Sequence, residues 1–368
     1  MKIAVFCQSL LTDYNYPIAH FLRGLISEIK KEHEVVVYER EQNEPLASTF
    51  KDYGKAPVNE FYRYYPRLNS TSYVPDQLVI DQCVQNVDLV FVHSATDMVT
   101  LNTLVELKHK NSFRLVFYDD GFTFVDNMQL IREMLAPVCD MILVNCHYIR
   151  EAYTQVMDGG DVDYLPYGID LNVFHPLSPN NEKNAILHLD WTDDRDIEEL
   201  EEFFIKPVRD LRIKASVIGS RYPKHIRKIL TDHSIDYKGW LPSFKLPEAL
   251  ANSTTVIHIP SKNSLEARAG SASMRMLECV SSGVPVISAP WTNSEKLLTP
   301  ARDYLQAKDS YEMTHYILEM MNSTLREVIS GHGLKSLATK HTCRMRAQDL
   351  NLLLTKLVNH DHAVPDSI

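Results

Sequence analysis

Short apolar runs alternate with longer amphipathic segments along the first half of the chain. The apolar runs predict strands at 2–7, 33–40, 88–94, 114–120 and 140–146. The central runs are apolar almost throughout, as strands buried on both faces of a sheet are. Helical periodicity predicts helices at 17–32, 75–86, 97–108 and 126–136, and only the stretch from about 43 to 73 is less regular. This alternation is typical of a parallel sheet covered by helices on both faces.

The same pattern starts again after a segment rich in Pro, Asn and Ser at 172–184, which is typical of a linker. Further strands are predicted at 185–191, 214–220, 236–240, 254–260 and 284–290, with helical segments between them. We therefore predict an α/β protein with two Rossmann-like, doubly wound domains, at residues 1–176 and 177–344. The last helix, at about 345–368, follows from the same periodicity, which leaves open whether it joins the N-terminal domain.

Composition narrows the class of protein. The chain has 368 residues, of which 45% are hydrophobic and 23% charged, as in soluble globular proteins with well-formed cores. A net charge of −10 opposes unspecific attraction to nucleic acid or anionic lipid, which favours small-molecule chemistry. Six scattered cysteines without metal-ligand spacing indicate a reducing compartment. With no signal-peptide pattern and no apolar stretch of the roughly 18 residues a membrane helix needs, we predict a cytoplasmic protein.

Several common catalytic motifs are absent. No G-x-G-x-x-G fingerprint follows the first strand, and the sequence contains no G-x-x-x-x-G-K-[ST] phosphate loop. It also lacks a G-x-S-x-G nucleophile elbow and an H-E-x-x-H zinc helix. Dehydrogenases, P-loop enzymes and these hydrolases are therefore disfavoured, and the chemistry is expected at strand ends and between the domains.

The segment 264–290 is the most informative part of the chain. Gly270, Ser271 and Ala272 lead into a predicted helix that carries Arg275 and Glu278. Free N–H groups at a helix start bind phosphate, and small side chains let a diphosphate approach the backbone. Glu278 lies nearly two turns further on, where its carboxylate can accept hydrogen bonds from ribose hydroxyls. An ordinary helix–loop–strand unit with a surface Arg and Glu fits the same residues equally well.

Three segments carry a resemblance to a known family. The string MRMLECVSSGVPVIS resembles the E-A-x-x-x-G-x-P-V-I segment of GT-B glycosyltransferases, and YLPYGIDLNVFHP (164–176) resembles their interdomain segment. DMILVNCHYIREAY is similar to the strand and helix that close their N-terminal domain. Within GT-B enzymes the chain looks nearest to the retaining group 1 type. The string GSASMRMLE is similar to the helix of spore-maturation CgeB-like glycosyltransferases, the subset it resembles most.

The resemblance implies an N-terminal acceptor domain (1–176) and a C-terminal nucleotide-sugar donor domain (177–344) that face a cleft, and an enzyme of the hexosyltransferase class. Such an enzyme moves a sugar from a nucleoside-diphosphate sugar, with a UDP-sugar favoured, to a hydroxyl acceptor with retention of configuration. It uses the nucleotide sugar as co-substrate, without a further cofactor and without metal. The acceptor stays open between a glycan, a small molecule, a protein and DNA.

One departure from the group 1 pattern affects the catalytic residues. These enzymes commonly carry two glutamates with seven residues between them, and counting back from Glu278 places Gly270 where the first is expected. The donor-sugar contact of that glutamate is therefore either assigned to Glu266 or Arg268, or absent. Arg195 is the candidate for holding the donor diphosphate, although a plain surface charge is the alternative reading of this residue.

The remaining donor contacts follow strands of the second domain. The resemblance places Gly239, Trp240 and Leu241 against the nucleotide base, where a core Trp beside a turn glycine is the alternative. Gly219 and Ser220 end the strand 214–220, at the edge where open α/β sheets bind ligands. A simple turn explains these two residues equally well.

In the first domain, His93 ends a predicted strand at its carboxyl edge, where group 1 enzymes often have a histidine that touches the donor sugar. Asp119 and Asp120 end the next strand, and both carboxylates are candidates for binding sugar hydroxyls or an acceptor. For Asp120, a turn-forming Asp-Gly pair is an equal alternative.

Two alternative functions are compatible with the same GT-B fold. A glycosyltransferase acting on modified bases of DNA requires a basic, aromatic-lined groove, for which Arg63, Tyr64, Tyr65 and Arg67 form the candidate patch. The net charge of −10 argues against this function. A catalytically degenerate nucleotide-binding scaffold is the second rival, and the missing glutamate at Gly270 is compatible with it.

Overall fold

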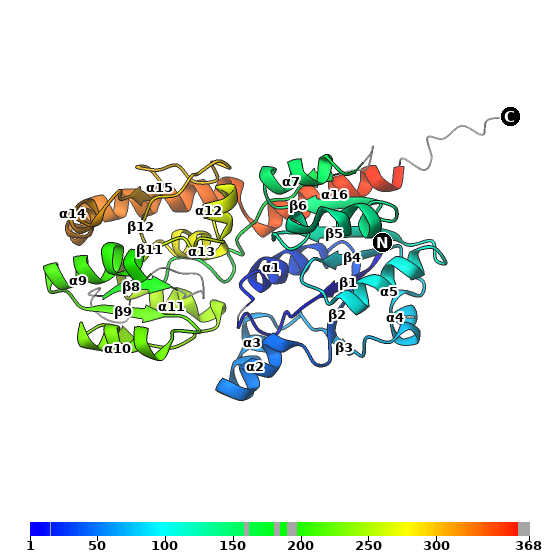
Figure 1. The fold of residues 1–368 in the computed structure, drawn as a ribbon, viewed down its shortest axis with the longest axis horizontal. Helices are drawn as coiled ribbons and strands as arrows, with labels where there is room; N and C mark the ends of the chain where they lie inside the picture. Colours follow the sequence, from blue (N-terminus) through cyan, green and yellow to red (C-terminus); the bar gives the residue numbers. More distant parts are fainter. Residues whose placement is uncertain (15, 158–161, 180–184, 190–196, 360–368) are drawn as a thin grey trace. The chain divides into compact units, whose positions relative to one another are not determined.

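The structure is a computed structural model and describes residues 1–14, 16–157, 162–179, 185–189 and 197–359. The chain forms two compact units, each built on a parallel sheet with helices packed against it (Figure 1). Unit 1 contains residues 1–168 and the C-terminal helix α16 (Cys343–Asn359). Unit 2 contains residues 169–342. The predicted α/β architecture of two doubly wound sheets is confirmed.

Unit 1 has a sheet in the order β3-β2-β1-β4-β5-β6-β7, with every neighbouring pair parallel. Its strands are β1 (Lys2–Cys7), β2 (Glu34–Arg40), β3 (Thr71–Tyr73), β4 (Leu89–His93), β5 (Arg114–Asp119), β6 (Met141–Val144) and β7 (Val162–Tyr164). All residues of β4 and β6 are buried, as the unbroken apolar pattern predicts. The chain reverses its direction of progress across the sheet between β1 and β4, which places a topological switch point there.

The helices of unit 1 connect these strands. They are α1 (Ala19–Ile29), α2 (Glu44–Tyr53), α3 (Ala56–Tyr64), α4 (Gln77–Val84), α5 (Met98–Lys108), the short turns η1 (Val125–Asn127), α6 (Met128–Leu130) and η2 (Ile131–Leu135), and α7 (His147–Thr154). Helix α16 packs against α1 (Figure 1). Asn351 of α16 donates a hydrogen bond to Glu32 (2.8 Å) and forms another with His33 (3.0 Å), both just beyond the end of α1.

Unit 2 has a parallel sheet in the order β10-β9-β8-β11-β12-β13. Its strands are β8 (Ala185–Leu189), β9 (Ala215–Ile218), β10 (Asp236–Tyr237), β11 (Ser253–His258), β12 (Val286–Ser288) and β13 (Leu305–Gln306). Its helices are α8 (Ile197–Leu200), η3 (Glu201–Ile205), α9 (Lys206–Leu211), α10 (Lys224–Asp232), η4 (Ser243–Lys245), α11 (Leu246–Ala251), α12 (Leu265–Ala269), α13 (Met274–Ser281), α14 (Ser310–Met321) and α15 (Ser323–Lys340).

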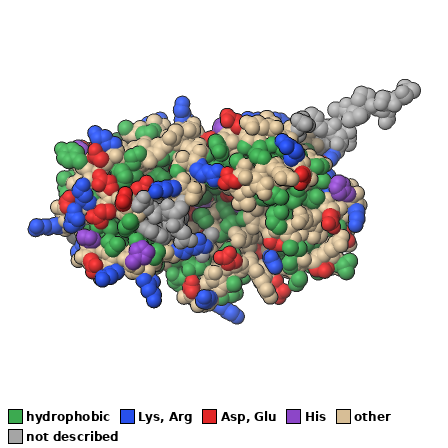
Figure 2. Space-filling view, in the orientation of Figure 1, with side chains coloured by type: hydrophobic (Ala, Val, Ile, Leu, Met, Phe, Trp, Pro, Cys, Tyr) green, Lys and Arg blue, Asp and Glu red, His purple; other side chains and the backbone are tan. Residues whose placement is uncertain are grey.

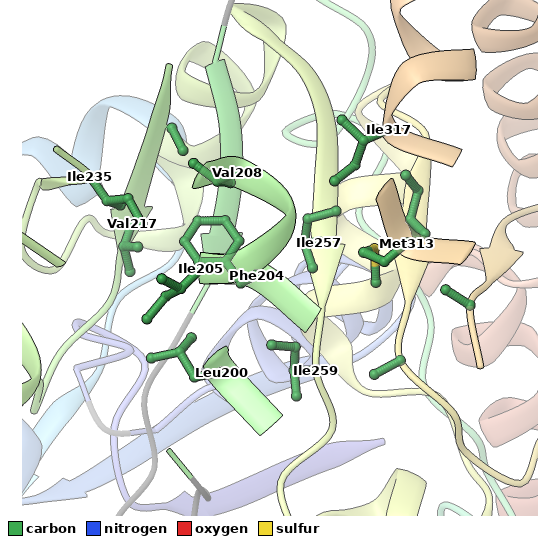
Figure 3. Close-up of a cluster of buried hydrophobic side chains, with 14 of the residues drawn as sticks. Leu200, Phe204, Ile205, Val208, Val217, Ile235, Ile257, Ile259, Met313 and Ile317 are labelled. Atoms are coloured by element: carbon green, nitrogen blue, oxygen red, sulfur yellow. The ribbon is translucent and has the colours of Figure 1, made fainter. Parts of the chain in front are cut away.

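The core of unit 2 lies between its sheet and the helices η3, α9 and α14. Phe204, Val217, Ile257 and Met313 are fully buried there (Figure 3). Removing such apolar side chains from water stabilises the unit by roughly 1.5–3 kcal/mol for each large residue. This packing holds the sheet rigid, so that its strand ends present loops in a defined arrangement.

Two parts of the chain differ from the sequence predictions. The irregular stretch at 43–73 contains α2, α3 and the short strand β3. The segment before α13 contains a separate helix, α12, which ends four residues before α13 starts. No helix in the described part of the chain combines the length and the apolarity needed to span a membrane.

Candidate functional site

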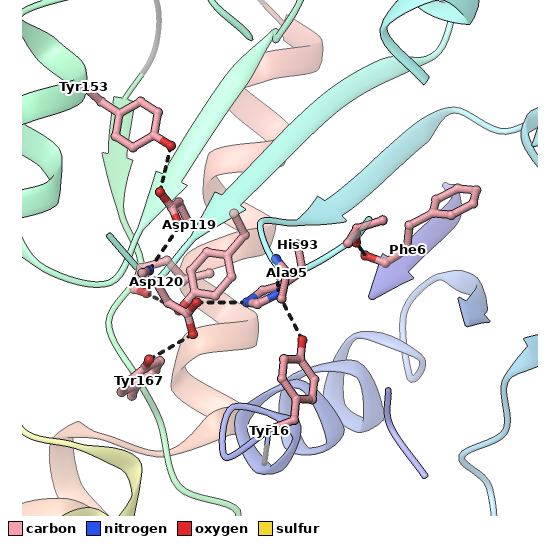
Figure 4. A network of polar contacts seen from close by, with 12 residues as sticks. Phe6, Tyr16, His93, Ala95, Asp119, Asp120, Tyr153 and Tyr167 are labelled. Atoms are coloured by element: carbon pink, nitrogen blue, oxygen red, sulfur yellow. Dashed lines mark hydrogen bonds and ion pairs between the residues drawn. The ribbon is translucent and has the colours of Figure 1, made fainter. Parts of the chain in front are cut away.

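His93 ends β4 and is 1% exposed. Its Nδ1 atom accepts a hydrogen bond from the backbone N–H of Ala95 (3.1 Å) and lies 3.0 Å from the Tyr16 hydroxyl. Its Nε2 atom lies 3.1 Å from Oδ1 of Asp120 (Figure 4). Because Nδ1 accepts the Ala95 N–H, we assign the ring proton to Nε2, which donates to the Asp120 carboxylate. Both ring nitrogens of the predicted sugar-contacting histidine therefore already have partners within unit 1.

Asp120 follows β5, and its carboxylate contacts both His93 and Tyr167. Its second oxygen, Oδ2, accepts a hydrogen bond from the Tyr167 hydroxyl (2.9 Å). Burial, and to a smaller extent the negative charge of Asp120, raise the pKa of both the Tyr16 and the Tyr167 hydroxyl well above its usual value. The tyrosines therefore stay protonated at physiological pH. We call His93, Tyr16, Asp120 and Tyr167 the His93 network.

Asp119 is the last residue of β5 and points away from this network, toward Tyr153 of α7 (Figure 4). It is fully buried and accepts hydrogen bonds from the Tyr153 hydroxyl (2.8 Å) and the Gly121 N–H (3.1 Å). Burial is the main reason that its pKa is raised to about 6, against the lowering effect of its hydrogen bonds with Tyr153 and Ser94. The predicted candidate Asp119 is therefore not hydrogen-bonded to His93. The carboxylate that contacts His93 is that of the neighbouring residue, Asp120.

Sequence reasoning left two members of the His93 network out. Tyr16 is 77 residues from His93, and Tyr167 is 47 residues from Asp120, so no local pattern connects these pairs. The sequence does indicate Asp120, since it follows a buried strand at the carboxyl edge of the sheet. The interpretation as a turn residue explained it equally well, and its contact with His93 was not predicted.

Glu266 lies on α12 and is 2% exposed. Its Oε1 atom lies 3.2 Å from Nε2 of His258, at the end of β11, and accepts the backbone N–H of Ser273 (2.9 Å). Burial raises the pKa of this carboxyl, but the hydrogen bond and charge of His258 and the Ser273 N–H outweigh burial and hold the pKa at about 2. An ionised carboxylate therefore lies at the start of α13.

The turn between α12 and α13 consists of small residues. Gly270 is the C-cap of α12 with φ of 62°, and a Cβ there would lie 2.2 Å from the carbonyl oxygen of Thr292. Ser271 and Ala272 are buried, and the Ser271 hydroxyl has no hydrogen-bond partner among the described residues. Ser273 caps α13 by accepting the Met276 N–H (3.2 Å). A buried hydroxyl and a helix N-terminus are thus present where the sequence predicts a diphosphate.

Arg275 and Glu278 face each other on α13 across one helical turn, as i and i+3 residues do. The guanidinium donates a short hydrogen bond to Oε2 of Glu278. The side chain of Glu278 is 3% exposed and that of Arg275 is 17% exposed. The alternative reading of both as surface charges does not apply to Glu278, which is buried.

The predicted base-binding residues lie on the loops after β9 and β10. The Gly219 N–H donates to the Gly239 carbonyl (2.9 Å), so the structure brings these two loops together. Trp240 is 8% exposed, whereas Ser220 and Leu241 are half-buried. Since all strands of this sheet are parallel, these loops share the carboxyl edge of the sheet with His258.

The remaining predicted residues are placed as follows. Arg268 is half-buried on α12, two residues from Glu266. Arg195 lies outside the described residues. Within the described ranges, no group of three or more His, Cys, Asp or Glu side chains is arranged to hold a metal ion.

The candidate nucleic-acid patch is smaller than the sequence indicates. Tyr65 is 5% exposed and stacks on Phe61 with ring centroids 5.2 Å apart, so it belongs to the core of unit 1. Arg63 and Arg67 are exposed and Tyr64 is half-buried. On the face drawn in Figure 2, basic and acidic side chains of the described residues are interspersed.

Part of the chain is similar to a known family of transferases. Residues 195–351 match a protein family described as glycosyl transferase-like. The matched segment contains the α12–α13 turn, the loops after β9 and β10 and the Arg275–Glu278 pair. No curated protein matches the chain. The family match supports the predicted transferase class.

Solved structures are similar to the chain over almost its whole length. HepE from Anabaena in complex with UDP is 13% identical, with 97% of this chain and 100% of that chain covered and a TM-score of 0.71. Sucrose-phosphate synthase from Thermosynechococcus elongatus is 12% identical, with coverages of 98% and 100% and a TM-score of 0.64. An α-glucosyltransferase in complex with UDP and a 13-mer DNA is 12% identical, with coverages of 96% and 99% and a TM-score of 0.68. These similarities establish the fold as GT-B, with two Rossmann-like domains, and confirm the predicted fold class.

Proposed function

We propose that this protein is a glycosyltransferase that moves a sugar from a nucleoside-diphosphate sugar, with UDP as the favoured nucleotide, to a hydroxyl acceptor. The observation that carries the proposal is the start of α13. The turn before it consists of small residues, and the buried Ser271 hydroxyl has no partner among the described residues. Phosphate oxygens are suited to such a group of donors at the positive end of a helix. The glycosyl transferase-like match includes this turn.

UDP is favoured because of the solved relatives. The HepE structures contain UDP, UDP with glucose, or UDP-glucose, and the α-glucosyltransferase structures contain UDP. In our proposal the α12–α13 turn holds the diphosphate and Glu278 holds the ribose. Gly239 and Trp240 contact the base.

The proposed reaction needs no metal, because the helix N-terminus and basic side chains offset the charge of the leaving diphosphate. We further propose that the sugar keeps its anomeric configuration, as the group 1 resemblance implies. The same resemblance assigns donor-sugar contacts to Glu266 or Arg268 in unit 2 and, separately, to His93 in unit 1. The six cysteines form no disulfide, which supports a reducing, cytoplasmic location.

A binding screen tests the donor site first. UDP, GDP, ADP, TDP and CDP are titrated into the purified protein by calorimetry and thermal shift, with EDTA and then with magnesium. A ligand at 100 times its Kd should stabilise the fold by about 2.7 kcal/mol. We expect UDP to bind best and equally well in EDTA. Absence of binding by all five diphosphates contradicts the proposal.

Turnover separates an active enzyme from a degenerate scaffold. UDP-sugars are incubated with the protein, and released UDP and the anomer of the product are followed by NMR. Release of the α-anomer from an α-linked donor is the outcome expected for retention. Tight UDP binding without hydrolysis or transfer from any UDP-sugar would favour the scaffold.

A second candidate function is transfer to modified bases of DNA. It is favoured by one observation, the similarity to an α-glucosyltransferase whose structure contains UDP and a 13-mer DNA. The core position of Tyr65 and the net charge of −10 weigh against it. Transfer of labelled sugar to a duplex with hydroxymethylated cytosines, compared with unmodified duplex, decides between the two acceptors.

A further inference from the structure

Helices α2 and α3 form a hairpin that packs against unit 1 with few of its residues. Helix α2 buries only Pro45 and Thr49, and α3 buries only Phe61. The two helices lie together at the lower edge of unit 1 in Figure 1. With ten and nine residues they are too short to be stable alone in water, so contacts with the rest of the protein hold them in place.

One side of the hairpin is anchored to the loop that follows β1. The hydroxyls of Thr12 and Thr49 are 2.7 Å apart, and the Tyr14 hydroxyl donates a hydrogen bond to Asp52 (2.7 Å). These contacts fix the inner side of the hairpin. Its outer residues are therefore presented in a defined position before any ligand arrives.

The turn between the two helices, residues 50–55, carries two aromatic and two basic side chains. Phe50 and Tyr53 are 39% and 40% exposed, and Lys51 and Lys55 are exposed as well. Phe50 and Tyr53 are three positions apart on α2, so their side chains are neighbours on the surface of that helix. We call residues 50–55 the hairpin tip.

The hairpin tip is open. A Cβ at Gly54 would meet no atom within 4 Å. In the described part of the chain, the side chains of Lys51 and Lys55 form no ion pair. Tyr62 on α3 is 44% exposed and adds a third ring. Three of the five exposed aromatic side chains among the described residues thus lie on this hairpin, which is a cluster and not the usual scatter of single exposed residues.

Exposed rings beside lysines match the interface of a lipid bilayer. At that interface, aromatic rings leave water at the level of the headgroups, and lysine ammonium groups stay with the lipid phosphates. Near a bilayer that contains anionic lipids, each lysine strengthens binding by about fivefold. The net charge of −10 does not prevent this contact, because charges more than about 8–10 Å from the surface are screened at physiological salt.

Duplex DNA fits the hairpin less well. Residues 44–67 contain four Lys or Arg and three Asp or Glu, whereas unspecific affinity for DNA depends on several cations whose charge is not offset. Phe50 has no polar atom for a phosphate or a base edge. In a bilayer the same ring contributes by leaving water.

We propose that the hairpin tip binds reversibly to the surface of a bilayer that contains anionic lipids. Phe50 and Tyr53 lie at the level of the headgroups, and Lys51 and Lys55 contact lipid phosphates. The attachment is peripheral and does not require a membrane-spanning helix. It is independent of the proposed function, since it uses no residue assigned to nucleotide or sugar.

Vesicle binding of the full chain tests this proposal. The protein is mixed with vesicles of phosphatidylcholine alone or with about 30% phosphatidylglycerol, and sedimentation measures the bound fraction at about 0.1 and 0.5 M NaCl. We expect binding to the anionic vesicles, little binding to phosphatidylcholine alone, and weaker binding at the higher salt. Titration with a DNA duplex and analytical ultracentrifugation without lipid examine the two other occupants, nucleic acid and a second copy of the chain.

A double change of the lysines tests the electrostatic part. Lys51→Gln with Lys55→Gln should weaken binding to anionic vesicles by about thirtyfold. Lys224→Gln with Lys228→Gln is the matched control, because these two exposed lysines of α10 are also four positions apart. Thermal unfolding verifies that each variant is folded.

A double change of the rings tests the apolar part. Phe50→Ser with Tyr53→Ser should weaken vesicle binding by at least about tenfold at either salt concentration. Tyr311→Ser is the control, since Tyr311 is 82% exposed on α14. Brominated lipids should quench the added tryptophan of Phe50→Trp, and not that of Tyr311→Trp.

Three results with vesicles overturn the proposal: no binding, equal binding to neutral and anionic vesicles, or equal losses in the control variants. Tighter binding of the DNA duplex through Lys51 and Lys55 overturns it in favour of nucleic acid. A dimer that Phe50→Ser with Tyr53→Ser dissociates overturns it in favour of a second copy of the chain.

Discussion

The Nε2 atom of His258 lies 3.2 Å from Oε1 of Glu266, and their side chains are 12% and 3% exposed. The other ring nitrogen, Nδ1, lies 3.0 Å from the Ser288 hydroxyl, whose own hydrogen is donated to the Ala289 carbonyl. His258 thus joins the end of β12 to the carboxylate at the start of α13, and this carboxylate is ionised because its pKa is held at about 2.

Glu266→Gln should destabilise unit 2 by about 1–3 kcal/mol, because it replaces the buried carboxylate that pairs with His258 and accepts the Ser273 N–H. The pKa of Glu266 is lowered from 4.5 to about 2, so its stabilisation is fully present above about pH 4.5 and is lost as the pH falls toward 2. Urea unfolding from pH 7 down to the acid limit of folding measures both effects. Glu327→Gln, an exposed change on α15, is the control. If the Glu266→Gln protein is as stable as the wild type but turns over more slowly, Glu266 acts in the reaction and does not stabilise the fold.

Asp119 should show the opposite dependence on pH. Its pKa is raised from 3.8 to about 6, so the folded state holds a proton that the unfolded state has lost. Stability therefore falls by about 3 kcal/mol as the pH rises from about 4 to about 6. Asp119→Asn keeps an acceptor for Tyr153 and should remove this slope, whereas the surface change Glu133→Gln should not. Identical pH profiles for wild type and Asp119→Asn would show that the carboxyl is not perturbed.

Glu278→Gln should weaken UDP binding by about 1–3 kcal/mol, the usual effect of losing a hydrogen bond to a charged group. The reason is that the proposed ribose contact uses the carboxylate that Arg275 orients. Calorimetric titration with UDP measures the change, again with Glu327→Gln for comparison. Unaltered affinity would remove Glu278 from the nucleotide site and leave its pairing with Arg275 as its role.

Gly270→Ala should destabilise the chain by at least about 2 kcal/mol, because a Cβ there requires a left-handed conformation and meets backbone atoms of Thr292 and Ser294. Gly331→Ala is the matched control, since its Cβ has no neighbour within 4 Å in the middle of α15. That change should stabilise the helix by about 0.5–1 kcal/mol. Thermal and urea unfolding of both variants provide the comparison, and a tolerated alanine at Gly270 would contradict this account of the turn.

The apolar runs predicted most of the sheet well, because buried parallel strands need unbroken apolar residues. Strand β1 occupies the predicted residues 2–7, β4 is one residue shorter than predicted at each end, and β5 is one residue shorter at its C-terminal end. The strands β3 and β13 have three and two residues, too few for any period to be visible. They were missed for this reason.

The site was predicted less completely, because its contacts join distant segments. Counting back from Glu278 across seven intervening residues leads to Gly270, but the structure requires glycine there to end α12. Glu266 reaches the start of α13 only because the chain turns back between the two helices. That turn depends on packing against residues 292–294, which no spacing rule contains.

The packing of α16 on α1 has a consequence for how the protein is made. The two ends of unit 2 meet, since Ile169 donates its N–H to the His341 carbonyl (2.9 Å) and forms a bridge with Thr342. Unit 2 is therefore a continuous insertion within unit 1. During translation, all of its residues are joined to the chain before α16 is synthesised. The inserted unit therefore has its full sequence first, whereas the unit that begins first waits for the last helix.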